Sequence, residues 1–407
     1  MPGRPAARLS RALTAVLRPV TEAAEGERLA VVGGVVRDRI LRLPLANRDV
    51  DVIVEGDAKM LARRVAKSGA GTVKLHERFD TATLLTPEGW SIDLARARRE
   101  IYRRPGALPE VSPATLEQDL GRRDFTINAM AIELEEGRGG RLHDPFGGAA
   151  DLDRRLLRVL HDRSFEDDPT RALRAVRYAA RLNLRLETRT RRSLDACVSG
   201  GALETVSADR LRRELARTLS ERRFAEAIRL FDSLGIGRAL HPGWRLTPAL
   251  RAALGRAERL ARRARPGEPT WLLPLLVWTG ELSEPACREL ALRLGLPAYA
   301  RRELERWPAT RHDRLAASGR AAPLSCDERL AAAALLPATG EGRQRKRRLL
   351  SPVALSIRGA DLLRAGIPPG PRVGRALAET REALGRGTIA PDEELEFALE
   401  AARRGGE

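Results

Sequence analysis

The stretch "AVVGGVVRDRILRLPLANRDVDVIV" at residues 30–54 decides the fold of the first part of the chain. It opens with an apolar run that predicts a buried strand, turns at Gly33 and Gly34, and continues as a helix. It ends in a second valine-rich run, residues 49–55, that carries two aspartates one residue apart. This order of strand, turn, helix and strand predicts a mixed α and β head whose second strand presents acidic side chains.

The two aspartates gain meaning from the geometry of a strand. Successive side chains point to opposite faces, so Asp49 and Asp51 share one face, roughly 7 Å apart, while the valines between them face the core. Two carboxylates this close repel each other unless a positive charge lies between them. Mg²⁺ suits this place, because it takes hard oxygen ligands and completes its shell with phosphates. A solvated pair on an edge strand is the alternative for such a motif alone.

The turn before the helix is the second chemical signal. Glycines at 33 and 34 would let a phosphate approach the backbone at the start of the helix. The pattern is neither the phosphate loop of nucleoside triphosphatases nor the dinucleotide fingerprint, and an ordinary tight turn would read the same. Next to a pair of metal-binding aspartates, however, it indicates a nucleoside triphosphate with Mg²⁺.

A third carboxylate could complete a site for two metal ions. Asp93 lies late in the β-rich segment "WSIDLARAR", between the apolar residues Ile92 and Leu94. On the same face as the aspartate pair, it could help to activate an attacking hydroxyl. An ordinary aspartate at the end of a strand is the alternative.

Composition sets the outer limits. The chain has 407 residues and a net charge of +18, which suggests a polyanionic partner, although lysine occurs only four times and an arginine-rich composition explains the sign equally well. No apolar run reaches the ~20 residues of a membrane span, so we expect no membrane contact. Cys197, Cys287 and Cys326 are too far apart for a metal site or a disulfide framework, which favours a reducing, cytoplasmic location.

The chain changes character near residue 165. Before this point strands and helices alternate, and after it the sequence is rich in Ala, Leu and Arg with helical periodicity. The N-terminal residues predict a helix rather than a secretory signal, because a continuous apolar core is missing.

Five motifs follow one another along the chain and lead to a family. After "GGVVRD…RDVDV" come "LGRRDFTINAMAI" at 120–132, "LHDPFGGAADLDRRLLRVL" at 142–160, "FEDDPTRALRAVRYAARL" at 165–182 and "VSADRLRREL" at 206–215. In this order they resemble the class II tRNA nucleotidyltransferases, which comprise the CCA-adding enzymes and their bacterial poly(A) polymerase relatives. The segment "IRGADLLRAGIPPGPRVG" at 357–374 resembles the tail of the same family.

The resemblance implies an α+β fold, with a polymerase-β-like nucleotidyltransferase head followed by an all-α neck, body and tail that bind tRNA. On this basis we expect an N-terminal helix in 1–27, the head in 28–162, the neck in 163–225, the body in 226–350 and the tail in 351–407. It implies Mg²⁺ as cofactor and the tRNA 3′ end, ATP and CTP as partners. It implies no protein partner.

The resemblance also assigns residues. It implies that Asp49 and Asp51 bind Mg²⁺ and that Asp93 is the third catalytic carboxylate. With the glycine turn it implies a set of nucleotide-binding residues, in which Asp168 and Arg171 read the base and most others contact phosphates: Gly33, Gly34, Arg37, Arg123, Asp168, Arg171, Arg174 and Arg177.

The helix that contains most of these arginines can also be interpreted from its own pattern. Asp167 or Asp168 can cap it, with a proline in its first turn. The arginines from 171 to 181 then occupy one broad face, and apolar residues the other. A solvated charged face is the bland interpretation, but this one lies beside a phosphate site. Asp168 accepts and Arg171 donates hydrogen bonds, so together they could imitate a complementary base edge.

Several features remain open. The family usually has Glu-Asp before the proline, whereas this chain has Asp167-Asp168, with Glu166 one position out of register. The linker at 97–120 contains "IYRRPGALPEV", which is closer to bacterial enzymes that add only the terminal A. His-Asp pairs at His143, His161 and His312 would suit a phosphohydrolase, but their spacing does not. The basic run "RQRKRR" at 343–348 is either a backbone-phosphate contact or a solvated loop.

The sequence therefore predicts an enzyme that adds CCA, or only its terminal A, to tRNA from CTP and ATP without a nucleic-acid template. The 3′-hydroxyl would attack the α-phosphate and release pyrophosphate by two-metal-ion transfer. A bacterial poly(A) polymerase is the enzymatic alternative. A degenerate homologue that only binds tRNA is the non-enzymatic one, and it would have lost the carboxylates.

Overall fold

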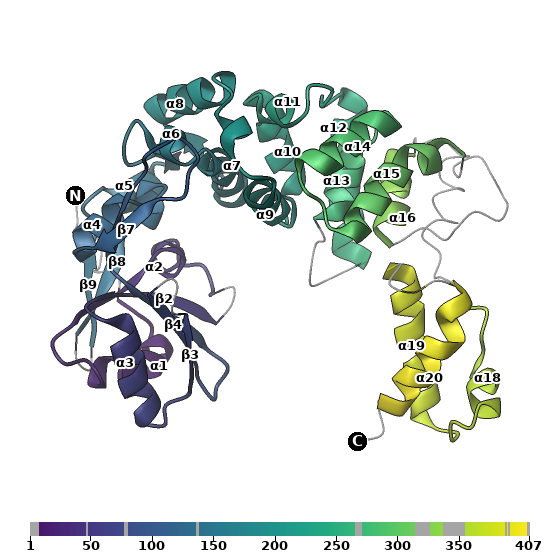
Figure 1. The fold of residues 1–407 in the computed structure, drawn as a ribbon, viewed down its shortest axis with the longest axis horizontal. Coiled ribbons are helices and arrows are strands. Elements are labelled where there is room, and N and C mark those ends of the chain that lie inside the picture. Colours follow the sequence, from purple (N-terminus) through teal and green to yellow (C-terminus); the bar gives the residue numbers. More distant parts are fainter. Residues whose placement is uncertain are drawn as a thin grey trace. The chain divides into compact units, whose positions relative to one another are not determined.

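The computed structural model describes residues 8–45, 48–76, 80–135, 138–264, 271–313, 326–336, 355–386, 389 and 391–404. The chain divides into two compact units, Met1–Val206 and Ser207–Glu407. Figure 1 shows strands and helices in the first unit and helices in the second, as the change in composition predicts. The basic run at 343–348 lies outside the described residues.

A seven-stranded mixed sheet forms the centre of the first unit, with the strand order β3-β4-β5-β2-β1-β8-β9. Only β2 and β5 run parallel, and all other neighbours are antiparallel. The strands are β1 (Arg28–Val32), β2 (Asp49–Glu55), β3 (Thr72–His76), β4 (Thr81–Leu85), β5 (Ser91–Arg96), β8 (Ala131–Glu135) and β9 (Arg138–His143). The strands predicted before the glycine turn and at residues 49–55 are confirmed, and β4 and β5 form an antiparallel pair.

One face of the sheet is covered by α3 (Ala58–Lys67), which packs on β2, β3, β4 and β5. Asp57 caps this helix and accepts hydrogen bonds from the backbone of Lys59 and Met60. The predicted N-terminal helix is α1 (Arg11–Glu22), which packs on α3. Buried alternate residues of β2, among them Val50 and Val52, explain why this side is closed.

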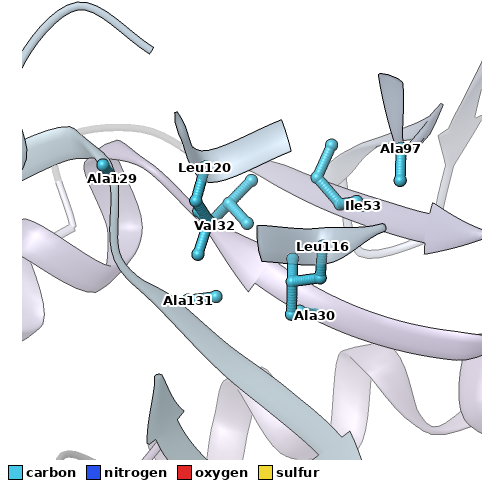
Figure 2. Packing of buried hydrophobic residues seen from close by; sticks show 8 residues of the cluster. All are labelled: Ala30, Val32, Ile53, Ala97, Leu116, Leu120, Ala129 and Ala131. Atoms are coloured by element: carbon cyan, nitrogen blue, oxygen red, sulfur yellow. The ribbon is translucent and has the colours of Figure 1, made fainter. Parts of the chain in front are cut away.

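The opposite face is covered only in part, by α4 (Leu116–Gly121) (Figure 2). Leu116 and Leu120 are almost fully buried in a cluster that lies over β1, β2 and β8: Ala30, Val32, Ile53, Ala97, Ala129 and Ala131. Burying each of these leucines contributes about 1.5–3 kcal/mol. Ile53 lies on the same face of β2 as Asp49 and Asp51. Ile53 is covered by the cluster, whereas the two aspartates are exposed to solvent.

The segment "FTINAMAIEL" at residues 125–134 contains two elements. A short 3₁₀ helix, η2 (Thr126–Asn128), comes first, and β8 follows it. Thr126, Ile127 and Asn128 are all buried. The start of this segment therefore turns through the interior and does not extend the sheet.

The remaining elements of the first unit connect the sheet to its helices. They are α2 (Gly34–Ile40), the hairpin of β6 (Arg98–Ile101) and β7 (Glu110–Pro113), α5 (Gly148–Asp153), the parallel pair β10 (Leu156–Leu157) and β11 (Arg185–Leu186), α6 (Ser164–Asp167), α7 (Thr170–Leu182), α8 (Thr188–Ser199) and η3 (Ala202–Thr205).

The second unit contains helices and no strand among its described residues. They are α9 (Ala208–Leu219), α10 (Phe224–Ser233), α11 (Ile236–Leu240), α12 (Pro248–Ala264), α13 (Leu272–Trp278), α14 (Glu284–Arg293), α15 (Ala298–Asp313), α16 (Cys326–Leu335), α18 (Gly359–Arg364), α19 (Pro371–Arg386), η4 (Pro391–Glu393) and α20 (Glu394–Arg404). Trp278 stacks between Trp244 and Phe231 in one core, and α18, α19 and α20 share another. No helix in the described part of the chain is long and apolar enough to cross a membrane.

Candidate active site

Three carboxylates come together on the open face of the sheet. β2 and β5 run side by side, and their register sets Asp51 directly beside Asp93. Asp49 lies two residues before Asp51 on the same face of β2. The structure thus joins the aspartate pair to the third carboxylate that the sequence singled out, across forty residues of chain that form a helix and two strands.

Electrostatics confirm that these side chains interact. Burial raises the pKa of Asp51, the Arg123 guanidinium opposes this rise, and the carboxylates of Asp93 and Asp49 raise the pKa further. The Asp51 carboxylate reaches solvent, yet protein surrounds it closely enough to remove part of its hydration. Ionised Asp51 is therefore under electrostatic strain, which a bound cation would relieve.

The glycine turn lies against this cluster. Gly33 precedes α2 with φ 69°, a conformation that favours glycine. A Cβ atom at this position would lie 3.3 Å from Arg123 Nη1 and 3.9 Å from Asp51 Oδ2. The backbone, the cation and the carboxylate therefore meet at Gly33, as the phosphate-site hypothesis requires. Asp119, which is fully buried, holds Arg123 from behind through a 3.0 Å contact.

Arg37 is almost completely buried, with 3% of its surface exposed. Its Nε donates to Asp38 Oδ1 at 2.8 Å, and its Nη1 donates to Asn128 Oδ1 at 2.7 Å. A Cβ at Gly34 would lie 3.6 Å from Arg37 Nη2. The predicted turn residues Gly34 and Arg37 are thus in direct contact, and the arginine is held rigidly.

One aromatic ring collects three of the predicted phosphate-binding arginines. The guanidinium carbons of Arg37, Arg174 and Arg177 lie 5.3, 5.8 and 4.9 Å from the centre of the Tyr178 ring. Phe125 packs edge-on against the same ring at 5.8 Å. The Tyr178 ring attracts each of these three cations by about 0.5–2 kcal/mol, which offsets part of the repulsion between their charges.

A buried ion pair ties α7 to the rest of the site. Arg174 donates from Nε and Nη2 to Asp124 Oδ2 at 2.8 and 2.6 Å. Burial raises the pKa of Asp124, but the Arg174 charge and hydrogen bonds from Asn128 and Arg174 outweigh this, and the pKa is lowered overall. Asp124 is therefore ionised and its charge is compensated inside the protein.

The predicted base-reading residues lie at the start of α7. Arg171 donates from Nη1 to Ser164 Oγ at 2.6 Å and from Nη2 to the Arg122 carbonyl at 2.8 Å. Asp168 Oδ1 accepts from the backbone and hydroxyl of Thr170 at 3.0 and 2.6 Å. These bonds orient both side chains, and a guanidinium has further N–H donors left for a ligand.

The start of α7 agrees with the predicted cap, which the sequence placed at Asp167 or Asp168. Asp167 ends α6, and Pro169, directly before Thr170, already has a helical φ of −61°. The extended residue Asp168 caps the helix, because its Oδ1 accepts from the backbone N–H of Thr170 at 3.0 Å. The arginine face is not the solvated surface of the alternative interpretation, because Arg171 is 5% exposed and the neighbouring arginines contact other parts of the unit. The arginines of this face can be buried because carboxylates, backbone carbonyls and the Tyr178 ring contact their guanidinium groups.

The tripeptide Arg122-Arg123-Asp124 connects all parts of the site. The Arg122 carbonyl accepts a hydrogen bond from Arg171. The Arg123 side chain lies beside Gly33 and Asp51. The Asp124 carboxylate accepts hydrogen bonds from Arg174. Arg122 itself is held by Asp119 and Glu100 at 2.7 Å each. Sequence reasoning found only Arg123 here, although the whole motif "RRDFTIN" was a signal that more than one residue takes part.

The linker at 97–120 forms the β6–β7 hairpin and reaches the base-reading region. The Tyr102 hydroxyl donates to Glu100 Oε2 at 2.9 Å, and burial together with the Glu100 carboxylate raises the pKa of Tyr102. The backbone N–H of Gly106 donates to the Asp167 carbonyl at 3.3 Å. Ile101 and Leu108, which flank these contacts in the sequence, are exposed.

Several residues of this site were not found from the sequence. Asp124, Asn128 and Tyr178 contact arginines of distant segments, and no local spacing reveals these contacts. Asp119 binds Arg122 and Arg123 at a spacing of three and four residues, a local signal that was not used. Thr83 was missed in the same way: its hydroxyl donates to Asp93 Oδ1 at 2.6 Å.

The described histidines of the His-Asp pairs lie in ion-pair contacts. No group of three His, Cys, Asp or Glu side chains that could hold a metal ion occurs in the described ranges, and this holds for the His-Asp pairs and for the three carboxylates of the sheet, where Mg²⁺ would also take phosphate ligands. His143 lies 3.3 Å from Glu117 in a network with Arg28, and His161 lies 4.0 Å from Asp167. The side chain of His312 is outside the described part.

An open face with three carboxylates, a glycine turn and a buried arginine cluster defines the chain as a polymerase-β-like nucleotidyltransferase. The model of the poly(A) polymerase head domain matches residues 29–158. The CC-adding tRNA nucleotidyltransferase of Deinococcus radiodurans is 36% identical over 375 residues, which cover 92% of this chain and 89% of the relative. The chain therefore belongs to the class II tRNA nucleotidyltransferase and poly(A) polymerase family, and the predicted family and fold class are confirmed.

Two further comparisons show how far the likeness extends. The A-adding tRNA nucleotidyltransferase of Geobacter sulfurreducens is 37% identical over 303 residues, which are 73% of this chain but only 34% of the relative's length. The solved structure of the Thermotoga maritima CCA-adding enzyme complexed with tRNA has a TM-score of 0.68 and 29% identity, covering 98% of this chain and 97% of that one. The likeness in fold thus includes the helical region.

Proposed function

We propose that the protein is a tRNA nucleotidyltransferase that adds nucleotides of the CCA end to tRNA from CTP and ATP. The observation that carries the proposal is the pairing of Asp51 with Asp93 beside Arg123 and Gly33. Three carboxylates against a glycine turn provide a place for a triphosphate and an attacking hydroxyl. The names of the relatives from Deinococcus and Geobacter support tRNA as the acceptor.

We assign the acidic residues of the site to the metal ion and the basic residues to the phosphates. Asp49 and Asp51 would hold Mg²⁺, and the raised pKa of Asp51 marks a place where a cation is favourable. When bound, Mg²⁺ lowers the pKa of an attacking hydroxyl and neutralises charge on the triphosphate. We assign Arg37, Arg174 and Arg177, which lie around the Tyr178 ring, to contacts with the phosphates, although Asp38 and Asp124 compensate part of the charge of Arg37 and Arg174.

The transfer then needs few further groups. The tRNA 3′-oxygen forms a bond to the α-phosphorus, the bond from this phosphorus to the bridging oxygen breaks, and pyrophosphate leaves. Asp93 accepts a hydrogen bond from the 3′-hydroxyl, orients it for attack and takes up its proton as the new bond forms. Arg123, held by Asp119, lies where it can balance the charge of the triphosphate.

Base selection is proposed for Asp168 and Arg171. Their positions are set by Thr170, Ser164 and the Arg122 carbonyl, so acceptor and donor groups are preorganised at the start of α7. A rigid donor and acceptor pair can match the edge of C or A in place of a template base.

We propose the family's division for the rest of the chain: an N-terminal helix in 1–27, a head in 28–162, a neck in 163–225, and a body and tail in 226–350 and 351–407 that bind tRNA. A net charge of +18 suits this partner. The three widely spaced cysteines favour a reducing cytoplasm.

The test uses tRNA transcripts that lack CCA, end in C or end in CC, each with CTP alone, ATP alone or both. Products of defined length support the proposal and separate CCA, CC and A addition. The sequence of the hairpin at 101–111 is closer to that of bacterial enzymes that add only the terminal A, which favours addition of A to transcripts ending in CC. Long A tails would indicate a poly(A) polymerase.

A variant with Asp49→Ala and Asp51→Ala is the matched control. It should bind tRNA like the wild type in a gel-shift assay and incorporate nothing. If the wild type also bound tRNA without incorporation, the chain would be a tRNA-binding homologue without activity. Full activity of the variant would overturn the metal assignment.

A further inference from the structure

A row of polar side chains crosses four neighbouring strands of the sheet. The register sets Lys74 of β3 opposite Thr83 of β4, Thr83 opposite Asp93 of β5, and Asp93 opposite Asp51 of β2. Directly opposed residues share a face, so this row lies on the same face as the carboxylates. His76 joins it, two residues beyond Lys74 on β3.

Hydrogen bonds run along the row to the third carboxylate. Thr83 Oγ1 donates to Asp93 Oδ1 at 2.6 Å, the length of a charge-assisted bond, and His76 Nε2 lies 3.1 Å from Thr83 Oγ1. A threonine hydroxyl has one proton, and here the carboxylate receives it. The hydroxyl must therefore accept from His76, and Nε2 must be the protonated nitrogen.

We propose that Thr83 and His76 are positioning residues for Asp93. Thr83 holds Oδ1 and so directs Oδ2 to the reacting hydroxyl, and His76 fixes the direction of the Thr83 hydroxyl. This inference rests on the proposed function, because it gives Asp93 the role of the third carboxylate.

The need for such a device follows from the freedom of a carboxylate. Rotation about the Cβ–Cγ bond of aspartate is broad, so the packing of β5 alone does not set the plane of the Asp93 carboxylate. Asp93 is exposed, and neighbouring Asp51 repels it. One short hydrogen bond from the adjacent strand removes this freedom without adding a charge.

The device does not depend on the charge of the histidine. The neutral tautomer with a proton on Nε2 and the imidazolium both donate from this atom. Lys74 and Asp93 are the charged residues directly opposite Thr83, and Thr83 donates its hydrogen bond to Asp93.

The first test measures single-nucleotide addition by the full-length chain. Thr83→Val keeps the shape but removes the hydroxyl, and we expect kcat to fall about 10-fold, with KM for the nucleotide, tRNA affinity and thermal midpoint unchanged. Thr83→Ser should restore kcat to within about twofold, because it returns the donor. Thr81→Val is the matched control on the same face of β4 and should behave like wild type.

A double variant tests whether Thr83 acts through Asp93. Thr83→Val should cause no further loss in an Asp93→Asn background, because the carboxylate that it orients is gone. Independent, multiplicative losses would overturn the proposal. So would a Thr83→Val enzyme that is as active as Thr81→Val, or one that serine fails to rescue.

The third test does not need activity. ¹⁵N NMR spectra distinguish the two histidine tautomers, and the chain has only five histidines, so a His76→Gln spectrum assigns the signal. We expect His76 to be protonated at Nε2 when neutral, and this signal to shift in Thr83→Val, which removes the hydroxyl that the Nε2 proton contacts. A proton on Nδ1 would overturn the hydrogen-bond chain even if the wild type proved fully active, whereas a wild type without incorporation would overturn the proposed function.

Discussion

The carboxylates of the sheet and the arginines of α7 are both charged clusters, but the protein compensates the charge of only one of them. Asp51 lies beside Asp93 and near Asp49, and its pKa is raised by burial and by these like charges. Arg174 lies on Asp124, and the pKa of this aspartate is lowered. The first cluster is left in need of a cation, whereas the second is neutralised within the protein.

We relate this difference in charge compensation to the two proposed tasks of the site, catalysis at the carboxylates and base selection at α7. A site that must take up metal and triphosphate gains affinity from strain that the ligand relieves. A site that must distinguish bases needs side chains with one orientation, which compensated contacts provide. Neutralising a charge should therefore have opposite effects on stability in the two regions.

Asp51→Asn should give the largest effect on activity. We expect nucleotide addition to fall by about 10³-fold or more, as for loss of a central catalytic group. The thermal midpoint should rise, because a carboxylate with a raised folded-state pKa costs stability when it is ionised at neutral pH, and asparagine removes this cost. Calorimetry and a primer-extension assay measure both. A thermal midpoint below that of the wild type would contradict the inference that ionised Asp51 is under electrostatic strain.

Arg174→Met should do the reverse to stability. It leaves the ionised Asp124 carboxylate buried without its partner, which costs about 3–5 kcal/mol of the free energy of unfolding. Urea titration measures this loss, and Asp124→Asn in the same chain should recover part of it. In the wild type the lowered pKa of Asp124 adds stability at neutral pH that is lost as the pH falls through its folded value.

Arg171→Lys should act mainly on selection. Arginine bonds Ser164 and the Arg122 carbonyl with two different nitrogens, which one lysine nitrogen cannot do. We expect the preference between ATP and CTP to weaken by about 10-fold, equivalent to about 1.4 kcal/mol. Competition assays with both nucleotides measure it. An unchanged ratio would remove Arg171 from base selection.

Tyr178→Leu should have a moderate effect. The ring no longer attracts Arg37, Arg174 and Arg177, and a loss of about 1 kcal/mol would raise KM for the nucleotide about fivefold. Tyr178→Phe keeps the π face and should stay near wild type in the same steady-state assay. Equal effects of both variants would point to the hydroxyl instead of the ring.

Glu166→Ala should have the smallest effect. Glu166 forms a 3.2 Å pair with Arg163, and both side chains are more than half exposed, so the pair contributes about 0–1 kcal/mol. We expect activity within about twofold of wild type. A large loss would mean that Glu166, although out of register with the family pattern, shares the role of its neighbour Asp168.

Much of this site followed from local patterns. The alternation in "DVDVIVE" predicted a strand with carboxylates on one face, and β2 has these bounds. The order of motifs predicted the family and the α+β fold. The pattern of α7 predicted its cap and the shared arginine face, but not the contacts of these arginines, because a periodic pattern shows which residues share a face and not what covers it.

The sequence by itself determined the two strands, the glycine turn and the residues that could carry charge, since these depend on periods of two and 3.6 and on glycine's freedom. Only the tertiary structure decided which charges are strained and which are satisfied. Asp93 meets Asp51 through strand pairing, Arg174 meets Asp124 across fifty residues, and Thr83 reaches Asp93 from the next strand. Such effects depend on distance and burial, which are properties of the packed chain and not of its spacing.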